Sequence, residues 1–434
     1  MGRIFCAIED YDTLLKARRP NGTSRTWGMK EFKEMSMSLI VDTHNRYNSQ
    51  NRVVTIPPFL DEHHELTTQN LPAGVKIDDW IQAQVKECGN FWYVDKSSIN
   101  SKKFLYIIHL YGSEYFEQHR DVGFKVIDED ILQKIRNNQG HIIVFFVNEP
   151  EPWVGPKGGT EPIFIDKWRE DVNLPPYSVS YFTGNYKLVQ DKDYLSKFGV
   201  NIKAFTAFYY TFSYYALRAN KKTFPYNPID NKNIFLSYMR LPRKHRWLIY
   251  AELVKRGLDE RGLISFGLDQ GNSGVSNQEL KEFIDKDILE EIKSKGERYI
   301  SDPTLEFNLA ESPFHEYDYC NTFLSIVNET SYTNTTIFLS EKIWKPIIAG
   351  QPFIVNGNPR TIKVLKDLGY KTFDKWWDES YDNETDLTKR INLLGDILEN
   401  LSKKTVEELK TIRKEMKQVL EHNQSLIYNI INTK

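Results

Sequence analysis

The residues with the clearest chemical pattern are Glu341 and Lys342, which begin a helix-like run between two apolar segments, 322–327 and 352–355. Backbone N–H groups and the dipole at a helix N-terminus favour an anion there. A lysine at this point suits a pyrophosphate, and a glutamate can accept hydrogen bonds from ribose hydroxyls. Pro346 fits this run if it lies in the first turn, where its missing N–H has no helical partner. The same spacing also fits an ordinary capped helix with a solvated polar face.

A second charged group combines Arg243, Lys244 and Arg246 with His245. It follows a predicted strand at 233–237 and leads into a predicted helix near residue 246. Positive charges at a helix N-terminus oppose its dipole and cost stability unless they face an anion. We therefore expect phosphate binding here. If both charged groups follow strands of one parallel sheet, they converge on a single pyrophosphate at the carboxyl ends of those strands.

These segments resemble the donor-binding signature of the fucosyltransferase-like glycosyltransferases, the α1,3-fucosyltransferase group. The run 323–355 is similar to its aromatic strand, polar turn, Glu-Lys helix start and Ala-Gly-x-Pro step, with matches at Asn328, Ser340, Glu341, Lys342, Ala349, Gly350 and Pro352. The run 235–250 is similar to the family's strand, turn and Arg-x-x-x-Tyr helix. Three departures are Phe338 in place of a tyrosine, Val327 before the asparagine, and Pro346 inside the helix.

The resemblance implies which residues bind the donor. Arg246 would contact the donor diphosphate, with Tyr250 one helical turn later and with Arg243 and Lys244 as competitors for the same role. The remaining implied donor-binding residues are Asn328, Phe338, Ser340, Glu341 and Lys342.

A weaker match to the same family covers residues 144–153 and 176–181. The family places a strand there that ends in a Glu-Ser-Pro-like turn, and a second strand after it. The resemblance makes Glu149, or else Glu151, the general base that deprotonates the acceptor hydroxyl, and a strand end facing a cleft is a suitable place for one. A turn held by prolines with solvated glutamates is the alternative interpretation.

Composition and periodicity indicate the elements that must position these residues. The chain has 434 residues and is 40% hydrophobic, which is enough for more than one core. Continuous apolar runs at 104–111, 141–147, 262–266 and 352–355 alternate with helix-like segments, which is typical of a parallel sheet covered on both faces.

These elements predict an α/β fold of two Rossmann-like domains that face each other across a cleft, as in GT-B glycosyltransferases. The N-terminal, acceptor-side domain covers 1–222, and a proline- and asparagine-containing linker covers 223–232. The nucleotide-sugar-binding domain covers 233–385. An amphipathic helical segment at 386–434 follows, and we expect it to pack across both domains.

Charge and cysteine content exclude several classes of protein. Lys+Arg of 57 against Asp+Glu of 59 excludes a globally basic nucleic-acid coat protein. The three cysteines have no CxxC spacing, so we expect neither a disulfide framework nor a zinc site. The acidic run 128–130 is better explained as a helix start than as a metal ligand set, because Ile131, Leu132 and Ile135 follow at helical spacing. We expect no metal, no cofactor, no membrane span and no signal peptide, and hence a cytoplasmic protein, or one of the host cytoplasm if viral.

The functional prediction is a hexosyl- or pentosyltransferase that moves a sugar from a UDP- or GDP-linked donor to an acceptor hydroxyl. The acceptor is either a glycan or a hydroxymethylated base in bacteriophage DNA, that is, DNA modification. DNA would need a basic groove, for which 16–25, 102–103 and 218–222 are candidates. The alternative is a non-catalytic glycan- or nucleic-acid-binding module derived from a glycosyltransferase, which the Phe338 departure favours. The loop 374–381, aromatic and acidic, either lines the donor cleft or plugs its domain.

Overall fold

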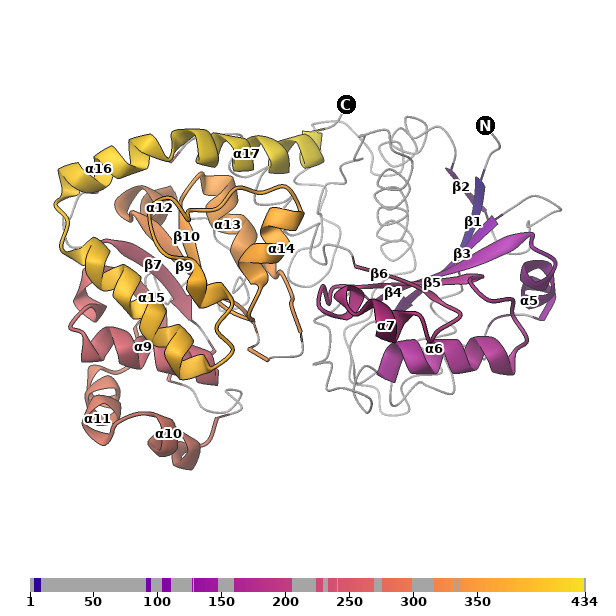
Figure 1. The fold of residues 1–434 in the computed structure, drawn as a ribbon, viewed down its shortest axis with the longest axis horizontal. Coiled ribbons are helices and arrows are strands. Elements are labelled where there is room, and N and C mark those ends of the chain that lie inside the picture. Colours follow the sequence, from indigo (N-terminus) through magenta and orange to yellow (C-terminus); the bar gives the residue numbers. More distant parts are fainter. Residues whose placement is uncertain are drawn as a thin grey trace, which may run out of the picture. The chain divides into compact units, whose positions relative to one another are not determined.

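The chain divides into two compact units, Met1–Tyr214 with Asn429–Lys434, and Tyr215–Tyr428. The computed structural model describes residues 4–8, 91–94, 104–110, 127, 129–146, 160–204, 224–228, 233–239, 241–268, 275–298, 316–330, 332–333 and 336–432. Each unit contains one parallel β-sheet with helices, as Figure 1 shows. The protein is therefore mixed α/β, and both sheets are compatible with Rossmann-like folds. The boundary between the units precedes the predicted linker 223–232.

The first unit has a six-stranded sheet in the order β2-β1-β3-β4-β5-β6, and all neighbouring strands pair in parallel. Its strands are β1 (Ile4–Ile8), β2 (Phe91–Val94), β3 (Phe104–Leu110), β4 (Gly140–Phe146), β5 (Val179–Thr183) and β6 (Asn201–Ala204). Its described helices are α5 (Glu129–Arg136), α6 (Thr160–Asp171), the 3-10 turn η4 (Leu188–Gln190) and α7 (Lys192–Leu195). The predicted strands at 104–111 and 141–147 correspond to β3 and β4.

Helix α5 begins at Glu129, which confirms the predicted helix start for residues 129–130; Asp128 lies outside the described residues. Glu129 and Asp130 lie exposed in its first turn, where the helix dipole favours negatively charged side chains. Ile131, Leu132 and Ile135 are buried in the core of this unit, where α5 packs against β4.

The second unit has a four-stranded sheet in the order β10-β9-β7-β8, again with every pair parallel. The strands are β7 (Phe235–Met239), β8 (Gly262–Phe266), β9 (Leu324–Asn328) and β10 (Phe353–Asn356). β9 and β10 are buried at every position, which is why they read as continuous apolar runs rather than alternating ones. These strands lie within two residues of the segments that the sequence predicts.

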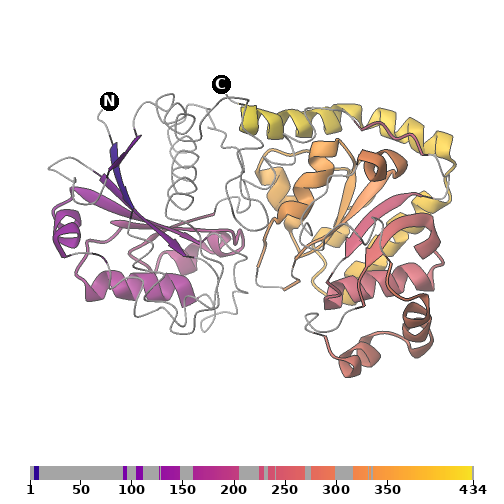
Figure 2. The ribbon, with the colours of Figure 1, turned by 180° about the vertical axis from the view of Figure 1, so that it is seen from behind.

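Helices cover both faces of this second sheet (Figures 1 and 2). α9 and α15 pack together on one face, and α13 packs against β9 on the other, with α12 beside it. The helices of this unit are α9 (Lys244–Lys255), the 3-10 turn η5 (Asp259–Arg261), α10 (Asn277–Phe283), α11 (Lys286–Lys295), α12 (Glu316–Asn321), α13 (Glu341–Ala349), α14 (Thr361–Asp367), the 3-10 turn η7 (Ser380–Asp382), α15 (Leu387–Ser402), α16 (Val406–Glu415) and α17 (Lys417–Asn432). Among the described helices, none combines the length and apolar character that crossing a membrane requires.

The strand order places a topological switch point between β7 and β9. From β7 the chain moves through α9 to β8 on one side, and later returns to β9 on the opposite side. Helices α9 and α13 therefore begin near the carboxyl ends of β7 and β9. In open α/β sheets, ligands bind in the crevice at this point. Both charged groups that the sequence singled out follow these two strands.

The prediction for Pro346 was wrong in its detail. α13 begins at Glu341, so Pro346 is its sixth residue and lies beyond the first turn. The helix tolerates the missing N–H and continues to Gly350, which adopts a left-handed conformation as the C-cap.

Arg390 on α15 holds the carboxyl end of β10 to the segment before α15. Its side chain is fully buried and donates to the carbonyl of Tyr381 and, at 3.2 Å, to that of Val355. The Asp382 carboxylate lies 3.7 Å from it. Burial lowers the pKa of Arg390 and raises that of Asp382, and their mutual attraction opposes both shifts.

Replacing Arg390 with Met should therefore destabilise the protein strongly, because it leaves a buried carboxylate without its counter-charge. The expected loss is about 3–5 kcal/mol in the free energy of unfolding, measured by urea denaturation. The neighbouring exposed Lys389→Met is the control and should change the stability by less than about 0.5 kcal/mol. Equal effects of the two substitutions would contradict this account of Arg390.

Candidate functional site

Three side chains from the start of α9 hold the turn that follows β9. His245 Nε2 lies 2.8 Å from the carbonyl oxygen of Glu329. Arg246 donates to the same carbonyl at 2.7 Å and to that of Asn328 at 3.2 Å, while Arg243 donates to the carbonyl of Thr330. Three consecutive carbonyls of the turn therefore accept from one helix N-terminus. Carbonyl groups carry no net charge, so these bonds orient the guanidinium groups without neutralising them.

The His245 ring must carry a hydrogen on Nε2 and donate from it, because a carbonyl oxygen can only accept. Burial lowers the pKa of His245 to about 3, and the adjacent Arg246 charge lowers it in addition. The imidazole therefore acts as an uncharged donor at physiological pH. A protonated His245 ring would repel the two neighbouring arginines and would also oppose the helix dipole.

Lys342 adds a third cation from the other side of the switch point. It is half-buried in the first turn of α13, and its Nζ donates to Thr330 Oγ1 at 3.1 Å. Arg243 is also half-buried, whereas Arg246 is buried behind the turn. Lys244 is exposed and lies over the ring of Phe283 in α10, 4.8 Å from its centroid. Arg243, Arg246 and Lys342 thus converge on residues 328–330, and Lys244 does not.

Glu329 contributes a buried carboxylate to the same turn. Its Oε1 accepts from the backbone N–H of Ser340 at 3.3 Å, and its Oε2 accepts from that of Thr330 at 3.2 Å. Ser340 is the N-cap of α13 and accepts from the N–H of Lys342. In a capping box the third helical residue would bond the N-cap N–H, but that residue is Ile343. Glu329 takes this role from the neighbouring strand end.

The Asn328 side chain is buried and makes its hydrogen bonds within the sheet. Its amide donates to Ser237 Oγ at 2.9 Å and to the carbonyl of Ile326, and its oxygen accepts from Asn356 Nδ2 at 2.8 Å. Asn356 also donates to the carbonyl of His245. The three polar side chains therefore connect β7, β9 and β10 to the first turn of α9 and fix the position of the turn.

The other predicted residues lie in different places. Phe338 and Tyr250 are buried in the core, and the Tyr250 ring lies 4.5 Å from that of Phe266. Glu341 is the first residue of α13, but its side chain is not among the described groups. Glu149 and Glu151 lie outside the described residues. The basic segments proposed for DNA, 16–25, 102–103 and 218–222, lie outside them as well.

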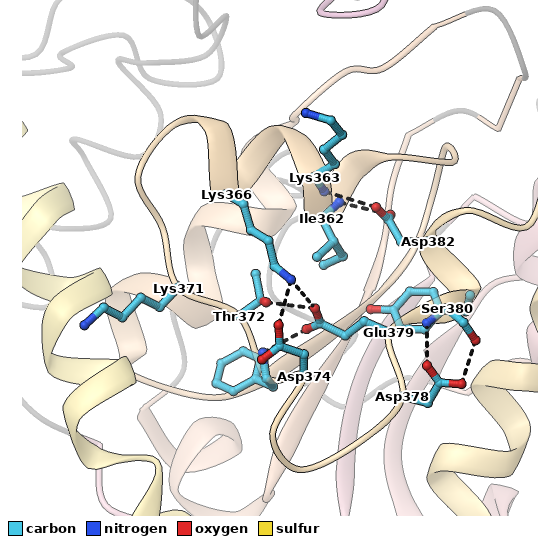
Figure 3. Close-up of polar contacts among 12 residues, drawn as sticks. Ile362, Lys363, Lys366, Lys371, Thr372, Asp374, Asp378, Glu379, Ser380 and Asp382 are labelled. Carbon is cyan, nitrogen blue, oxygen red and sulfur yellow. Dashed lines mark hydrogen bonds and ion pairs between the residues drawn. The ribbon is translucent and has the colours of Figure 1, made fainter.

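The aromatic-acidic loop 374–381 packs on its own unit, and its carboxylates bond to nearby residues of that unit (Figure 3). Glu379 accepts from Thr372 Oγ1 and from the N–H of Phe373, both at 2.8 Å, and Lys366 lies 3.1 Å from it. Trp377 is buried with its ring centroid 5.2 Å from that of Phe373. Trp377 therefore completes the core, whereas Asp374 and Asp378 are exposed and have the local partners Lys366 and Ser380.

Within the described residues, no cluster of three or more His, Cys, Asp or Glu side chains is placed to hold a metal ion. Comparison with known proteins adds no identification, since neither the protein-family models nor the curated proteins include a match to this chain.

His245 should make stability depend on pH. Its pKa is about 3 in the folded protein and near the ordinary histidine value of 6.5 in the unfolded chain, so the unfolded state takes up the extra proton first as pH falls. Its contribution is complete above pH 6.5 and is lost as pH drops toward 3. Urea denaturation should show a decline that is steeper in the wild type than in His245→Gln, by up to about 1.4 kcal/mol per pH unit. Parallel pH profiles for the two proteins would contradict this assignment.

Gly357, which follows β10, leaves the space that the Glu329 side chain occupies. A Cβ at residue 357 would lie 2.9 Å from both Cβ and Cγ of Glu329. Its φ is not positive, so alanine is acceptable to the backbone and the cost is steric. We expect Gly357→Ala to lower the free energy of unfolding by about 1–3 kcal/mol. Adding Glu329→Ala, which removes the Cγ contact, should make the Gly357→Ala step less costly; an unchanged step would count against this packing.

Proposed function

We propose that this protein is a glycosyltransferase that binds the diphosphate of a nucleotide-sugar donor at the switch point of its second sheet. The observation that carries the proposal is the convergence of Arg243, Arg246 and Lys342 on residues 328–330, between the N-termini of α9 and α13. Helix N-termini and fixed cations are the groups that bind a diphosphate. The resemblance of the same segments to fucosyltransferase-like enzymes supports a sugar-linked diphosphate.

The three cations have different roles in this proposal, according to how deeply each is buried. Lys342 and Arg243 are half-buried, which supports a direct contact of these two side chains with the phosphate oxygens. Arg246 lies behind the turn and holds its carbonyls, so it positions the site and adds its charge. When the sugar is transferred, negative charge develops on the leaving diphosphate, and positioned cations stabilise it in the transition state. This assignment gives Arg243 the direct contact that the resemblance gives to Arg246.

The acceptor side of the proposal rests on the sequence. Glu149, with Glu151 as the alternative, would remove the proton from the acceptor hydroxyl as the bond to the sugar forms. The acceptor is either a glycan or a hydroxymethylated base in phage DNA. A GT-B arrangement, with this base opposite the donor site, belongs to the same proposal.

Lys342→Ala should weaken the binding of a nucleoside diphosphate by about 1.5–3 kcal/mol, because a charge-assisted contact to the diphosphate is lost. Isothermal titration with UDP and GDP measures this. Lys345→Ala on the same helix removes an equal charge, but Lys345 lies near the ring of Tyr238, so its effect should be smaller. Equal binding by wild type and Lys342→Ala would remove Lys342 from the site.

Glu149→Gln should reduce turnover by about 10²–10⁴-fold, since it keeps the shape of the side chain but cannot accept the proton. Donor affinity should remain at the wild-type value, and Glu151→Gln should lose much less activity. Assays would pair each nucleotide sugar with glycan acceptors and with hydroxymethylated DNA. Donor binding by the wild type without turnover on any acceptor would favour the non-catalytic module instead.

A further inference from the structure

Arg360 is a further cation at the carboxyl edge of the second sheet, shortly after the end of β10. β10 pairs with β9, and the last paired residues are Asn356 and Asn328, so both chains leave the sheet at the same level. Neighbouring strands of a sheet lie about 4.8 Å apart. The segment 357–360 therefore begins one strand spacing away from the turn 328–330, on which the cations of the proposed site converge.

Two contacts join the segment 357–360 to the chain that follows β9. Gly357 lies against the Glu329 side chain, where an added Cβ would be 2.9 Å from Cγ. Asn358 Oδ1 accepts from the backbone N–H of Thr333. Arg360 follows Asn358 after one proline, so it lies beside the turn of the proposed site.

Arg360 has a backbone conformation that is unfavourable for arginine. Its φ is 68° and its ψ is 15°, in the left-handed region, where a residue with a Cβ is strained. Among the described residues of the second unit, it is the one non-glycine residue with positive φ. Glycine would adopt this conformation without strain. The arginine side chain therefore needs an explanation other than the fold of the loop.

Asp382 holds the backbone of Arg360 in this conformation. Its carbonyl accepts from the Arg360 N–H at 2.6 Å. Its carboxylate accepts from the N–H groups of Ile362 and Lys363, both at 3.0 Å (Figure 3). These contacts involve the backbone of 360–363 alone, so they fix the position of residue 360 whatever its side chain.

The Arg360 side chain is exposed, and no hydrogen bond or ion pair joins it to the part of the chain that the structure describes. By contrast, Arg256, Arg298 and Arg390 of the same unit each form an ion pair with a carboxylate. Strained residues occur preferentially at sites that bind ligands. A guanidinium fork held at such a position is suited to two oxygens of a phosphate.

We propose that Arg360 binds the same donor diphosphate as Arg243 and Lys342, from the β10 side of the turn. An extended arginine side chain is long enough to cross one strand spacing. The other two cations act from the starts of α9 and α13, so the diphosphate is bound from three elements of the sheet edge. Asp382 is a positioning residue that acts through the backbone of Arg360. This proposal rests on the proposed function.

Titration calorimetry of the full chain with UDP, GDP and inorganic pyrophosphate tests the proposal. Arg360→Gly removes the guanidinium and relieves the backbone, so each diphosphate should bind about tenfold more weakly than to the wild type. Arg360→Lys keeps the charge without the planar fork and should restore only part of the affinity. Lys363→Ala is the matched control, because it removes a nearby exposed charge that pairs with Asp367, and its affinity should remain at the wild-type value.

Thermal unfolding without ligand separates binding from a structural role. Glycine favours positive φ, so Arg360→Gly should melt at the wild-type temperature or up to about 4 °C above it, with a smaller rise on adding diphosphate. Arg360→Ala, which keeps the strain, should bind as weakly as Arg360→Gly without the gain in melting temperature. If Arg360→Gly melts clearly below the wild type, the arginine side chain stabilises the fold and the proposal is overturned.

The binding outcomes distinguish this proposal from the proposed function. If the wild type binds diphosphates and Arg360→Gly binds them equally well, the proposal is wrong and the proposed function stands. If the wild type binds none of UDP, GDP and pyrophosphate, both are wrong. A loss with UDP and GDP but not with pyrophosphate would place Arg360 against the nucleoside and overturn the phosphate contact. An equal loss with all three, with Lys363→Ala unchanged, supports the proposal.

Discussion

The geometry of the switch point in the second unit depends on one set of contacts, the hydrogen bonds from the start of α9 to the turn after β9. Three side chains of the α9 N-terminus donate to the carbonyls of residues 328–330, and they fix this turn against the start of α9. The turn in turn positions Glu329 at the start of α13 and Thr330 beside Lys342. A disturbance at the start of α9 would therefore reach both helices that frame the switch point.

Positive charge at the start of α9 is unfavourable, and this explains why His245 is neutral. Two arginines at a helix N-terminus oppose the helix dipole, and a protonated imidazole between them would oppose it further. Burial keeps His245 neutral, with its pKa near 3, so the ring holds the turn without adding charge. The described bonds from Arg243 and Arg246 to the turn end on uncharged carbonyl groups, so these bonds do not neutralise the guanidinium groups. A positive, preorganised turn at the carboxyl edge of a sheet is suited to an anionic ligand.

Much of the fold was predictable from the sequence because parallel strands buried on both faces read as continuous apolar runs. β3, β4, β7, β8, β9 and β10 were all found this way, and α5 was found from helical spacing. The short β1 and β2 were not predicted. The start of α13 at Glu341 was predicted, but Pro346 is the sixth residue from that start and was wrongly assigned to the first turn.

The candidate site was predictable in its location but not in its internal roles. Cations that follow two strands identified the switch point, since carboxyl ends of parallel strands meet at one edge. The sequence did not reveal that Asn328 links strands, that Tyr250 and Phe338 are core residues, or that Lys244 lies over Phe283. Glu329 was missed although one signal was present: α13 has Ile343 where a capping box needs an acidic residue.

Titration calorimetry of the full chain with UDP and GDP, each against its monophosphate, tests the central claim most directly. Cations at two helix N-termini should favour the second phosphate, so each diphosphate should bind at least about tenfold more tightly than its monophosphate. Added salt should reduce this difference in affinity. No binding of either diphosphate, or equal affinity for mono- and diphosphates, would contradict a diphosphate site at the switch point of the second sheet.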